Sequence, residues 1–212
     1  MRTMMESAHL DWSWQDLRRF SDVLRLRNGQ PLTVRFVEPQ DGAALQAYFK
    51  ALSPEARYNR FTGASNGLSN HELDVLLHIG DRNRFAVIAE MMVDGARTIV
   101  GEARYMVDEA AGSLEFGLSV QEGYRGQGIG FALLSNLECR AAAFGARRVF
   151  GDTLRTNADM QALARRSGYT FTNTPGDWRE VRVVKTVPVA AEDIPCVQWR
   201  NVATARSLHV GV

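Results

Sequence analysis

The chain contains few of the residues that build metal sites or disulfide frameworks. It has only 2 cysteines and 4 histidines among 212 residues. Cys139 and Cys196 are far apart in the sequence and match no metal-binding or redox spacing, which suits a reducing cytosol. His71-Glu72 lacks the second histidine of a zinc-protease helix, because Val75 stands four residues after His71. We therefore expect no metal site.

The sequence also lacks an excess of charge and any long apolar segment. Its 25 basic and 24 acidic side chains give a formal net charge of +1, so electrostatics gives no reason to expect a nucleic-acid or membrane partner. No apolar run approaches the length of a membrane span, and Met1–Leu10 has no apolar core of the kind that a signal peptide requires. We expect a cytoplasmic protein with one domain and appendages.

A glycine-rich stretch, Val120–Gly130, is the feature around which the rest of the sequence is arranged. An alternating apolar run at 114–120 leads into it, and a helical pattern at 131–144 follows it. A strand, a glycine-rich turn and a helix together present backbone N–H groups to an anion, usually a phosphate. Glycines at 126, 128 and 130 let the backbone approach such a ligand, and Arg125 adds a cationic side chain at the mouth.

Three kinds of phosphate loop compete for this stretch. The nucleoside-triphosphate loop needs Gly-Lys-Ser/Thr, but Gly130 is followed by Phe131-Ala132. The dinucleotide pattern Gly-x-Gly-x-x-Gly fails because the third glycine comes one residue early. The pattern Arg-x-x-Gly-x-Gly fits at Arg125, Gly128 and Gly130, and it resembles the pyrophosphate loop of the GNAT superfamily of acyl-CoA N-acyltransferases. A glycine-rich connector without a ligand is the alternative.

The remaining patterns predict a mixed α/β (α+β) fold. We expect strands at 32–37, 85–93, 98–107, 114–120, 148–154, 169–172 and 179–187, and helices at 39–52, 53–61, 70–79, 131–144 and 157–167, after an N-terminal helix that begins near Leu10 and ends at Asn28-Gly29. The strand at 148–154 should lie parallel beside 114–120, because a helix connects the two. This order resembles the GNAT fold, with a mixed central sheet of about seven strands around the strand–loop–helix core.

The resemblance covers residues 30–187, with an N-terminal accessory helix in 1–29 and a C-terminal tail at 188–212. Within the superfamily the chain is most similar to bacterial Pat-type protein-lysine acetyltransferase domains. The segments that carry this similarity are Leu52–Phe61, Ile99–Arg104, Leu114–Phe116 and Asn157–Tyr169. We expect the N-terminal helix to dock on the domain or on a second subunit, which leaves a homodimer open.

The resemblance implies acetyl-CoA as the co-substrate and also implies which residues bind it. Backbone groups of Leu118 and Val120 would pair with the pantetheine arm and polarise the thioester carbonyl. Asn157 would contact the pantetheine or its bound water. The pyrophosphate would be held by the amides of Gly126, Gln127, Gly128, Ile129 and Gly130, with Arg125 beside them.

A general base is the residue that this chemistry most needs. An amine acceptor with a pKa of about 10.4 arrives protonated and must lose a proton before it attacks the thioester. Glu115 is our candidate, because it lies on the strand face opposite the apolar residues and the resemblance implies the same role. The alternative is a structural glutamate paired with Arg104 on the neighbouring strand. Glu102 and Glu122 are weaker candidates.

The expected activity is the transfer of an acetyl group from acetyl-CoA to a primary amine, with a protein lysine as the favoured acceptor. Many GNAT enzymes have a tyrosine as general acid where this sequence has Ala164, and Pat-type domains commonly have alanine there as well. A small-molecule amine acetyltransferase and a non-catalytic acyl-CoA-binding module are the two alternatives.

Overall fold

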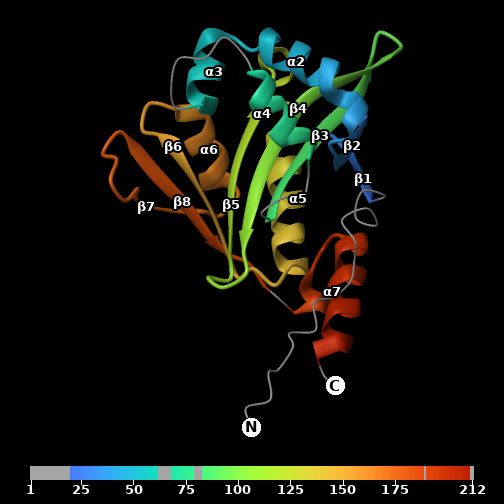
Figure 1. Cartoon of the computed structure of the whole chain (residues 1–212), viewed down its shortest axis with the longest axis vertical. Coiled ribbons are helices and arrows are strands. Elements are labelled where there is room, and N and C mark those ends of the chain that lie inside the picture. Colours follow the sequence, from blue (N-terminus) through green and yellow to red (C-terminus); the bar gives the residue numbers. More distant parts are fainter. Residues whose placement is uncertain (1–19, 62–67, 79–82, 189, 211–212) are drawn as a thin grey trace.

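One mixed sheet with helices on both faces organises the chain (Figure 1). The computed structural model describes residues 20–61, 68–78, 83–188 and 190–210. The strands are β1 (Ser21–Arg25), β2 (Pro31–Phe36), β3 (Arg84–Val93), β4 (Ala96–Asp108), β5 (Ser113–Val120), β6 (Arg148–Leu154), β7 (Thr170–Asn173) and β8 (Glu180–Thr186). Their order is β1-β2-β3-β4-β5-β6-β8-β7, and only β5 and β6 pair in parallel. The mixed α/β fold and the parallel pair are therefore confirmed.

Two groups of helices cover the two faces of the sheet (Figure 1). The helices are η1 (Pro39–Asp41), α2 (Gly42–Ala51), α3 (Pro54–Phe61), α4 (Asn70–Leu77), η3 (Glu122–Tyr124), α5 (Ile129–Ala143), α6 (Ala158–Arg166), η4 (Ala191–Asp193) and α7 (Val197–Val210). On one face α2, α3 and α4 contact β4, β5 and β3, and on the other face α5 lies against the sheet with α7 packed on it. None of the described helices combines the length and the apolar character needed to cross a membrane.

Local sequence signals account for several element ends. The turn between β3 and β4 is Asp94-Gly95, in which both residues have positive φ angles, 49° and 80°. The helix α4 begins with a capping box, in which Ser69 Oγ accepts from the Glu72 N–H and the Glu72 carboxylate accepts from the Ser69 N–H. These two positions were predicted from the sequence, and the structure confirms them.

The predicted N-terminal helix is wrong in the part that the structure describes. Residues Ser21–Arg25 form β1, which pairs antiparallel with β2, and this strand raises the count from seven to eight. The Asn28-Gly29 signal closes the turn between these strands, with Gly29 at φ 82°, and does not end a helix. The spacing of the apolar residues suits either element, and pairing with β2 decides in favour of the strand. The earlier part of the predicted helix lies outside the described residues.

The predicted C-terminal tail is also wrong, because much of it forms a helix that belongs to the core. Trp199 on α7 is 0% exposed and lies against Phe20, Phe36 and Phe144. Its indole N–H donates to the Asp22 carboxylate on β1 at 2.9 Å. The two segments that flank the expected domain therefore meet each other and extend the same core.

The two cysteines form a disulfide, which their sequence spacing did not indicate. Cys139 on α5 and Cys196, which immediately precedes α7, have Cα atoms 6.0 Å apart and are covalently joined. The bond links α7 to the long helix on this face of the sheet. The two cysteines are 57 residues apart in the sequence, and they meet only because α7 packs against α5 in the tertiary structure.

We predict that Trp199→Ala lowers the free energy of unfolding by about 3–5 kcal/mol, because it leaves a cavity and removes one of the hydrogen-bond donors to the buried Asp22 carboxylate. Chemical denaturation followed by circular dichroism measures this change. Val197→Ala on the same helix is the control, because Val197 is 65% exposed and its loss should stay within about 0.5 kcal/mol. Equal effects of the two substitutions would contradict the assignment of α7 to the core.

Candidate active site

The central feature of the site is a fork between two parallel strands. Only three residue pairs join β5 to β6, namely Ser113 with Arg148, Leu114 with Val149 and Glu115 with Phe150. Beyond Glu115 the two strands separate, although β5 continues to Val120 and β6 to Leu154. The fork exposes backbone groups of residues 116–120 that a continuous sheet would pair.

Gly151 allows the two strands to come together at the fork. A Cβ atom at this position would lie 2.7 Å from the carbonyl oxygen of Phe116 and 3.2 Å from the Phe116 ring. Such distances are too short for any side chain. The close approach of β5 and β6 at these residues, which directly follow the last residue pair, therefore requires glycine at position 151.

The glycine-rich loop leaves the end of β5 and opens α5, as the sequence predicts. Gly128 is the N-cap of α5 with φ 95°, and Gly126 has φ 77°. No described atom lies within 4 Å of the position that a Cβ would take at either residue, so both face open space. The first N–H groups of a helix of this length point at that space and provide an anion-binding geometry.

A cavity of about 520 Å³, here named the loop cavity, lies beside this turn. Of the nine residues predicted to bind a co-substrate, eight line it: Leu118, Val120, Arg125, Gly126, Gly128, Ile129, Gly130 and Asn157. Gln127 is not part of its lining. Arg125 is already paired, at 3.0 Å with Asp159 and at 3.8 Å with Glu122, so a phosphate would compete with these carboxylates.

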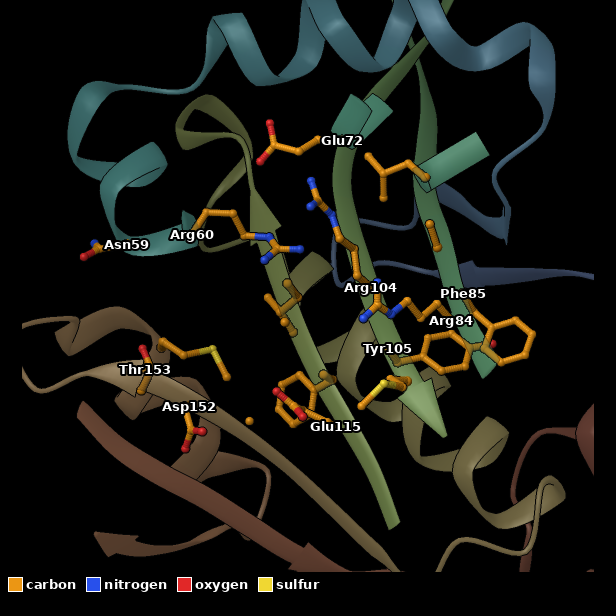
Figure 2. Close-up of a pocket in the computed structure, with 18 of the residues that line it drawn as sticks. Asn59, Arg60, Glu72, Arg84, Phe85, Arg104, Tyr105, Glu115, Asp152 and Thr153 are labelled. Carbon is orange, nitrogen blue, oxygen red and sulfur yellow. The ribbon is translucent and has the colours of Figure 1, made fainter. Parts of the chain in front are cut away.

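A second cavity of about 770 Å³, here named the sheet cavity, is lined by residues of both β5 and β6, among them Glu115 (Figure 2). Its lining includes the charged residues Arg60, Glu72, Arg84, Arg104, Glu115, Asp152 and Glu180, and also His71. Burial and the nearby charge of Asp152 raise the pKa of Glu180. Sequence reasoning missed Asp152 and Glu180, because the pairing of β6 with β8 is what brings them into this space.

The two cavities meet beside Leu118. Five residues line both of them: Asn59, Arg60, Leu118, Asn157 and Met160. The arrangement therefore has two chambers that touch at the fork, one beside the glycine loop and one beside Glu115.

Glu115 does not form the ion pair with Arg104 that was the alternative interpretation. The strand register places Glu115 opposite Met106, and its side chain is exposed. The Arg104 guanidinium lies over the rings of Phe49 and Phe61, and its Nε is 3.5 Å from the carboxylate of Glu102. Within the described part of the chain, Glu115 has no ion-pair partner.

The two weaker base candidates are already engaged in structural contacts. The Glu122 carboxylate accepts from the Ser53 N–H at 3.0 Å and so tethers the start of α3. Glu102 is fully buried and accepts from Arg60 on α3 and from the Ser119 hydroxyl at 3.0 Å. Neither carboxylate lines either cavity.

Glu102 is the centre of a buried charged cluster that the sequence did not indicate. Burial by itself would raise the pKa of Glu102, but the guanidinium groups of Arg60 and Arg104 outweigh burial, so the pKa is lowered. Burial lowers the pKa of Arg104 to about 10, and the like charge of Arg60 adds to this shift. One carboxylate thus holds two guanidinium groups in place.

The chain matches the acetyltransferase (GNAT) family over residues 47–169, which is more than half of its length. It belongs to the GNAT acetyltransferase family.

Solved structures of other acyltransferases share this fold at low identity. The GNAT domain of S. lividans PAT is 23% identical, with a TM-score of 0.71 over 79% of this chain and 97% of that chain. A cAMP-binding acyltransferase from Mycobacterium smegmatis is 21% identical, with a TM-score of 0.56 over 96% of this chain and 63% of that one. Spermidine N-acetyltransferase from Vibrio cholerae, solved with CoA and spermine, is 16% identical, with a TM-score of 0.60 over 73% of this chain and 95% of that one.

Asn157 and Ala164 are two further positions to which the resemblance to GNAT proteins drew attention. Asn157 caps α6, accepting from the Met160 N–H at 3.1 Å and donating to Thr153 Oγ1 at 3.1 Å, so its amide is held in place at the contact between the cavities. Ala164 is fully buried, and nearby Tyr169 lines neither cavity. In the described residues, no group of three or more side chains could hold a metal ion.

We predict that Glu102→Gln lowers the free energy of unfolding at pH 7 by about 3–5 kcal/mol, because it leaves Arg60 and Arg104 without a buried counter-charge. The pKa of Glu102 is lowered in the folded protein, so its stabilisation is present above the ordinary value of 4.5 and is lost as the pH falls below it. The variant should therefore lose less stability than the wild type on acidification through this range.

Urea denaturation at a series of pH values checks this expectation. Glu109→Gln, in the exposed turn between β4 and β5, removes the same charge without burial and should change little. A wild-type stability at pH 7 in the Glu102→Gln variant would show that the cluster contributes nothing.

Proposed function

We propose that this GNAT protein transfers an acetyl group from acetyl-CoA to a primary amine, with a protein lysine as the first candidate acceptor. The observation that carries the proposal is the pair of cavities that meet at Leu118 beside the β5–β6 fork. A two-substrate transfer needs two chambers that touch at one point, and a simple binding module needs only one.

The loop cavity fits the pyrophosphate and pantetheine of acetyl-CoA. The glycines at 126 and 128 leave a cradle that side chains would fill, and the N-terminus of α5 supplies N–H donors. The unpaired backbone of residues 116–120 lies where an extended pantetheine arm could add to the edge of β5. When bound, acetyl-CoA supplies the thioester that the amine attacks.

Glu115 is the proposed general base. It stands at the last residue pair before the fork, lines the sheet cavity, and has no ion pair with any other described residue. A carboxylate at this position can accept a proton from an ammonium group that enters the sheet cavity, directly or through one water. Its exposure also permits exchange of that proton with solvent.

The choice of acceptor rests on different observations for the two candidates. The fold similarity to the GNAT domain of S. lividans PAT supports a protein lysine. The Asp152 carboxylate is paired with Arg182, which leaves Glu115 and Glu180 as carboxylates of the sheet cavity that could attract a cation. These two residues, together with the fold similarity to a spermidine N-acetyltransferase, support a small polyamine-like acceptor as the second candidate. A thiol-release assay with lysine-bearing proteins and with small amines decides between them, and coenzyme A binding without turnover would indicate a non-catalytic module.

A homodimer and a cytoplasmic location stay proposals. Light scattering on the purified chain measures the mass in solution, and fractionation of the source cells locates the protein. Each result is independent of the assignment of the cavities.

We predict that Gly128→Glu abolishes coenzyme A binding, because the carboxylate enters the cradle with bulk and with the same charge as the pyrophosphate. The positive φ at this residue adds about 1–3 kcal/mol of strain, so circular dichroism must show that the variant is folded. Isothermal titration measures the affinity.

The matched control for this loop variant is Gly123→Glu. Gly123 lies in η3, has open space around it and does not need a positive φ, so it accepts the same charge outside the cradle. Binding should persist in this control. Wild-type affinity in folded Gly128→Glu would remove the basis for the co-substrate assignment.

We predict that Glu115→Gln lowers the maximal rate by about 10²–10⁴, which is typical of a lost general base, while the affinity for acetyl-CoA persists. The rate of the variant should recover in part at high pH, because a larger fraction of the acceptor is then already neutral. Steady-state kinetics with an accepted amine and titration with coenzyme A measure the two quantities.

Two other carboxylates make this experiment specific. Glu109→Gln, far from the cavity in the β4–β5 turn, should retain the wild-type rate. Glu180→Gln removes the competing carboxylate of the sheet cavity. If Glu180→Gln shows the large loss and Glu115→Gln does not, the base is Glu180.

A further inference from the structure

Arg60 occupies the point at which the two cavities meet. Of the five described residues that line both cavities, it alone is charged. It lies near the end of α3, and its side chain reaches across to the strands beside the fork (Figure 2). A cation at this point faces both the chamber assigned to the thioester and the chamber assigned to the amine.

The guanidinium of Arg60 is held in one position by contacts behind it. Its Nε and Nη2 donate to the Glu102 carboxylate, which also accepts from Ser119 Oγ, and Ser119 Oγ is 3.0 Å from Tyr48 Oη. The side chain is only 11% exposed. An arginine that is anchored through two of its nitrogens keeps Nη1 oriented without further reorganisation.

Gly117 supplies the space that Arg60 needs on β5. A Cβ atom at Gly117 would lie 2.9 Å from Arg60 Nη1 and 3.4 Å from Cζ. The guanidinium therefore packs directly on the strand backbone, one residue before Leu118. Because Leu118 lines both cavities, Nη1 lies next to the place where the proposed reaction occurs.

We infer that Arg60 is a catalytic residue whose guanidinium stabilises the negative charge that forms as the thioester is cleaved. The inference rests on the proposed function. The neutral amine nitrogen forms a bond to the carbonyl carbon, and negative charge develops on the carbonyl oxygen. The C–S bond then breaks with its electron pair leaving on sulfur. Glu115, which has already passed the first proton of the entering ammonium to solvent, accepts the second proton from the nitrogen of the intermediate. A fixed cation in a site with little water stabilises this charge more than solvent does.

Coenzyme A itself gives a readout that does not depend on turnover. Its free thiol has an alkaline pKa, which a parallel titration of coenzyme A without protein measures, and a nearby cation favours the thiolate. If Arg60 lies beside the sulfur, coenzyme A bound to the wild-type protein should titrate below that value. The thiolate is followed by its ultraviolet absorbance in a pH titration of the complex.

The main variant combines Arg60→Met with Glu102→Gln, because removing Arg60 alone would leave the buried Glu102 carboxylate with only the more distant Arg104 guanidinium, 3.5 Å away, as its ion-pair partner. Coenzyme A affinity should stay within a few-fold of the wild type, and the thiol pKa should return to that of free coenzyme A. The maximal rate should fall by about 10²–10³, as it does when one preorganised donor to the developing charge is removed.

Two further variants separate catalysis from stability. Gly117→Ala keeps every charge but displaces Nη1, so it should lower the rate roughly ten-fold or more in a folded protein. Lys185→Met with Glu138→Gln neutralises a comparable ion pair, 2.7 Å long between β8 and α5 and outside both cavities, and should leave the rate unchanged.

The outcomes distinguish this inference from the proposed function. If coenzyme A binds and its thiol titrates as in free solution, with the Arg60 and Gly117 variants near the wild-type rate, Arg60 has only a structural role and the inference is overturned. Failure of the wild type to bind coenzyme A overturns the proposed function and the inference together. A lowered thiol pKa that depends on Arg60 supports the inference even where the acceptor is unidentified.

Discussion

The separation of β5 from β6 after Glu115 is the constraint on which the site depends. Parallel strands in a sheet normally continue their pairing, and unpaired backbone groups inside a protein are costly unless a ligand or water satisfies them. Here the pairing stops after three residue pairs, and two cavities that share Leu118 lie beside the opening. Gly151 permits the close approach before the fork, and the glycine loop turns the chain from the end of β5 into α5.

A second constraint is the buried charge around Glu102. A single carboxylate with two guanidinium groups is an expensive arrangement for a core, and apolar residues of similar size would often be as stable. The cluster instead fixes the positions of its members. It connects α3 to β4 and β5, and it holds Arg60 over Gly117 at the contact between the cavities. An arrangement that is costly for stability and specific in geometry is expected where a site requires a fixed cation.

The opposite face of the sheet supports the helix that opens the loop. Asp22 on β1 accepts from Asn136 on α5 and from Trp199 on α7, and the Arg140 guanidinium lies over the rings of both Phe36 and Trp199. The disulfide between Cys139 and Cys196 joins the same two helices covalently. Both β1 and α7 therefore contact α5 and stabilise its position. The N-terminus of α5 in turn lines the loop cavity.

The sequence by itself determined the elements whose signals are local. The alternating run at 114–120, the glycines at 126–130 and the helix after them predicted the loop, and eight of nine expected co-substrate residues line one cavity. The sequence also placed Glu115 on the correct strand, although its role stays a proposal. Tertiary structure alone decided that Ser21–Arg25 is a strand, that Trp199 is buried, and that Cys139 meets Cys196. It also placed Arg60 and Glu102 together, 42 residues apart in the chain. Such contacts depend on which surfaces meet after the sheet has formed, and no periodicity within a short segment encodes them.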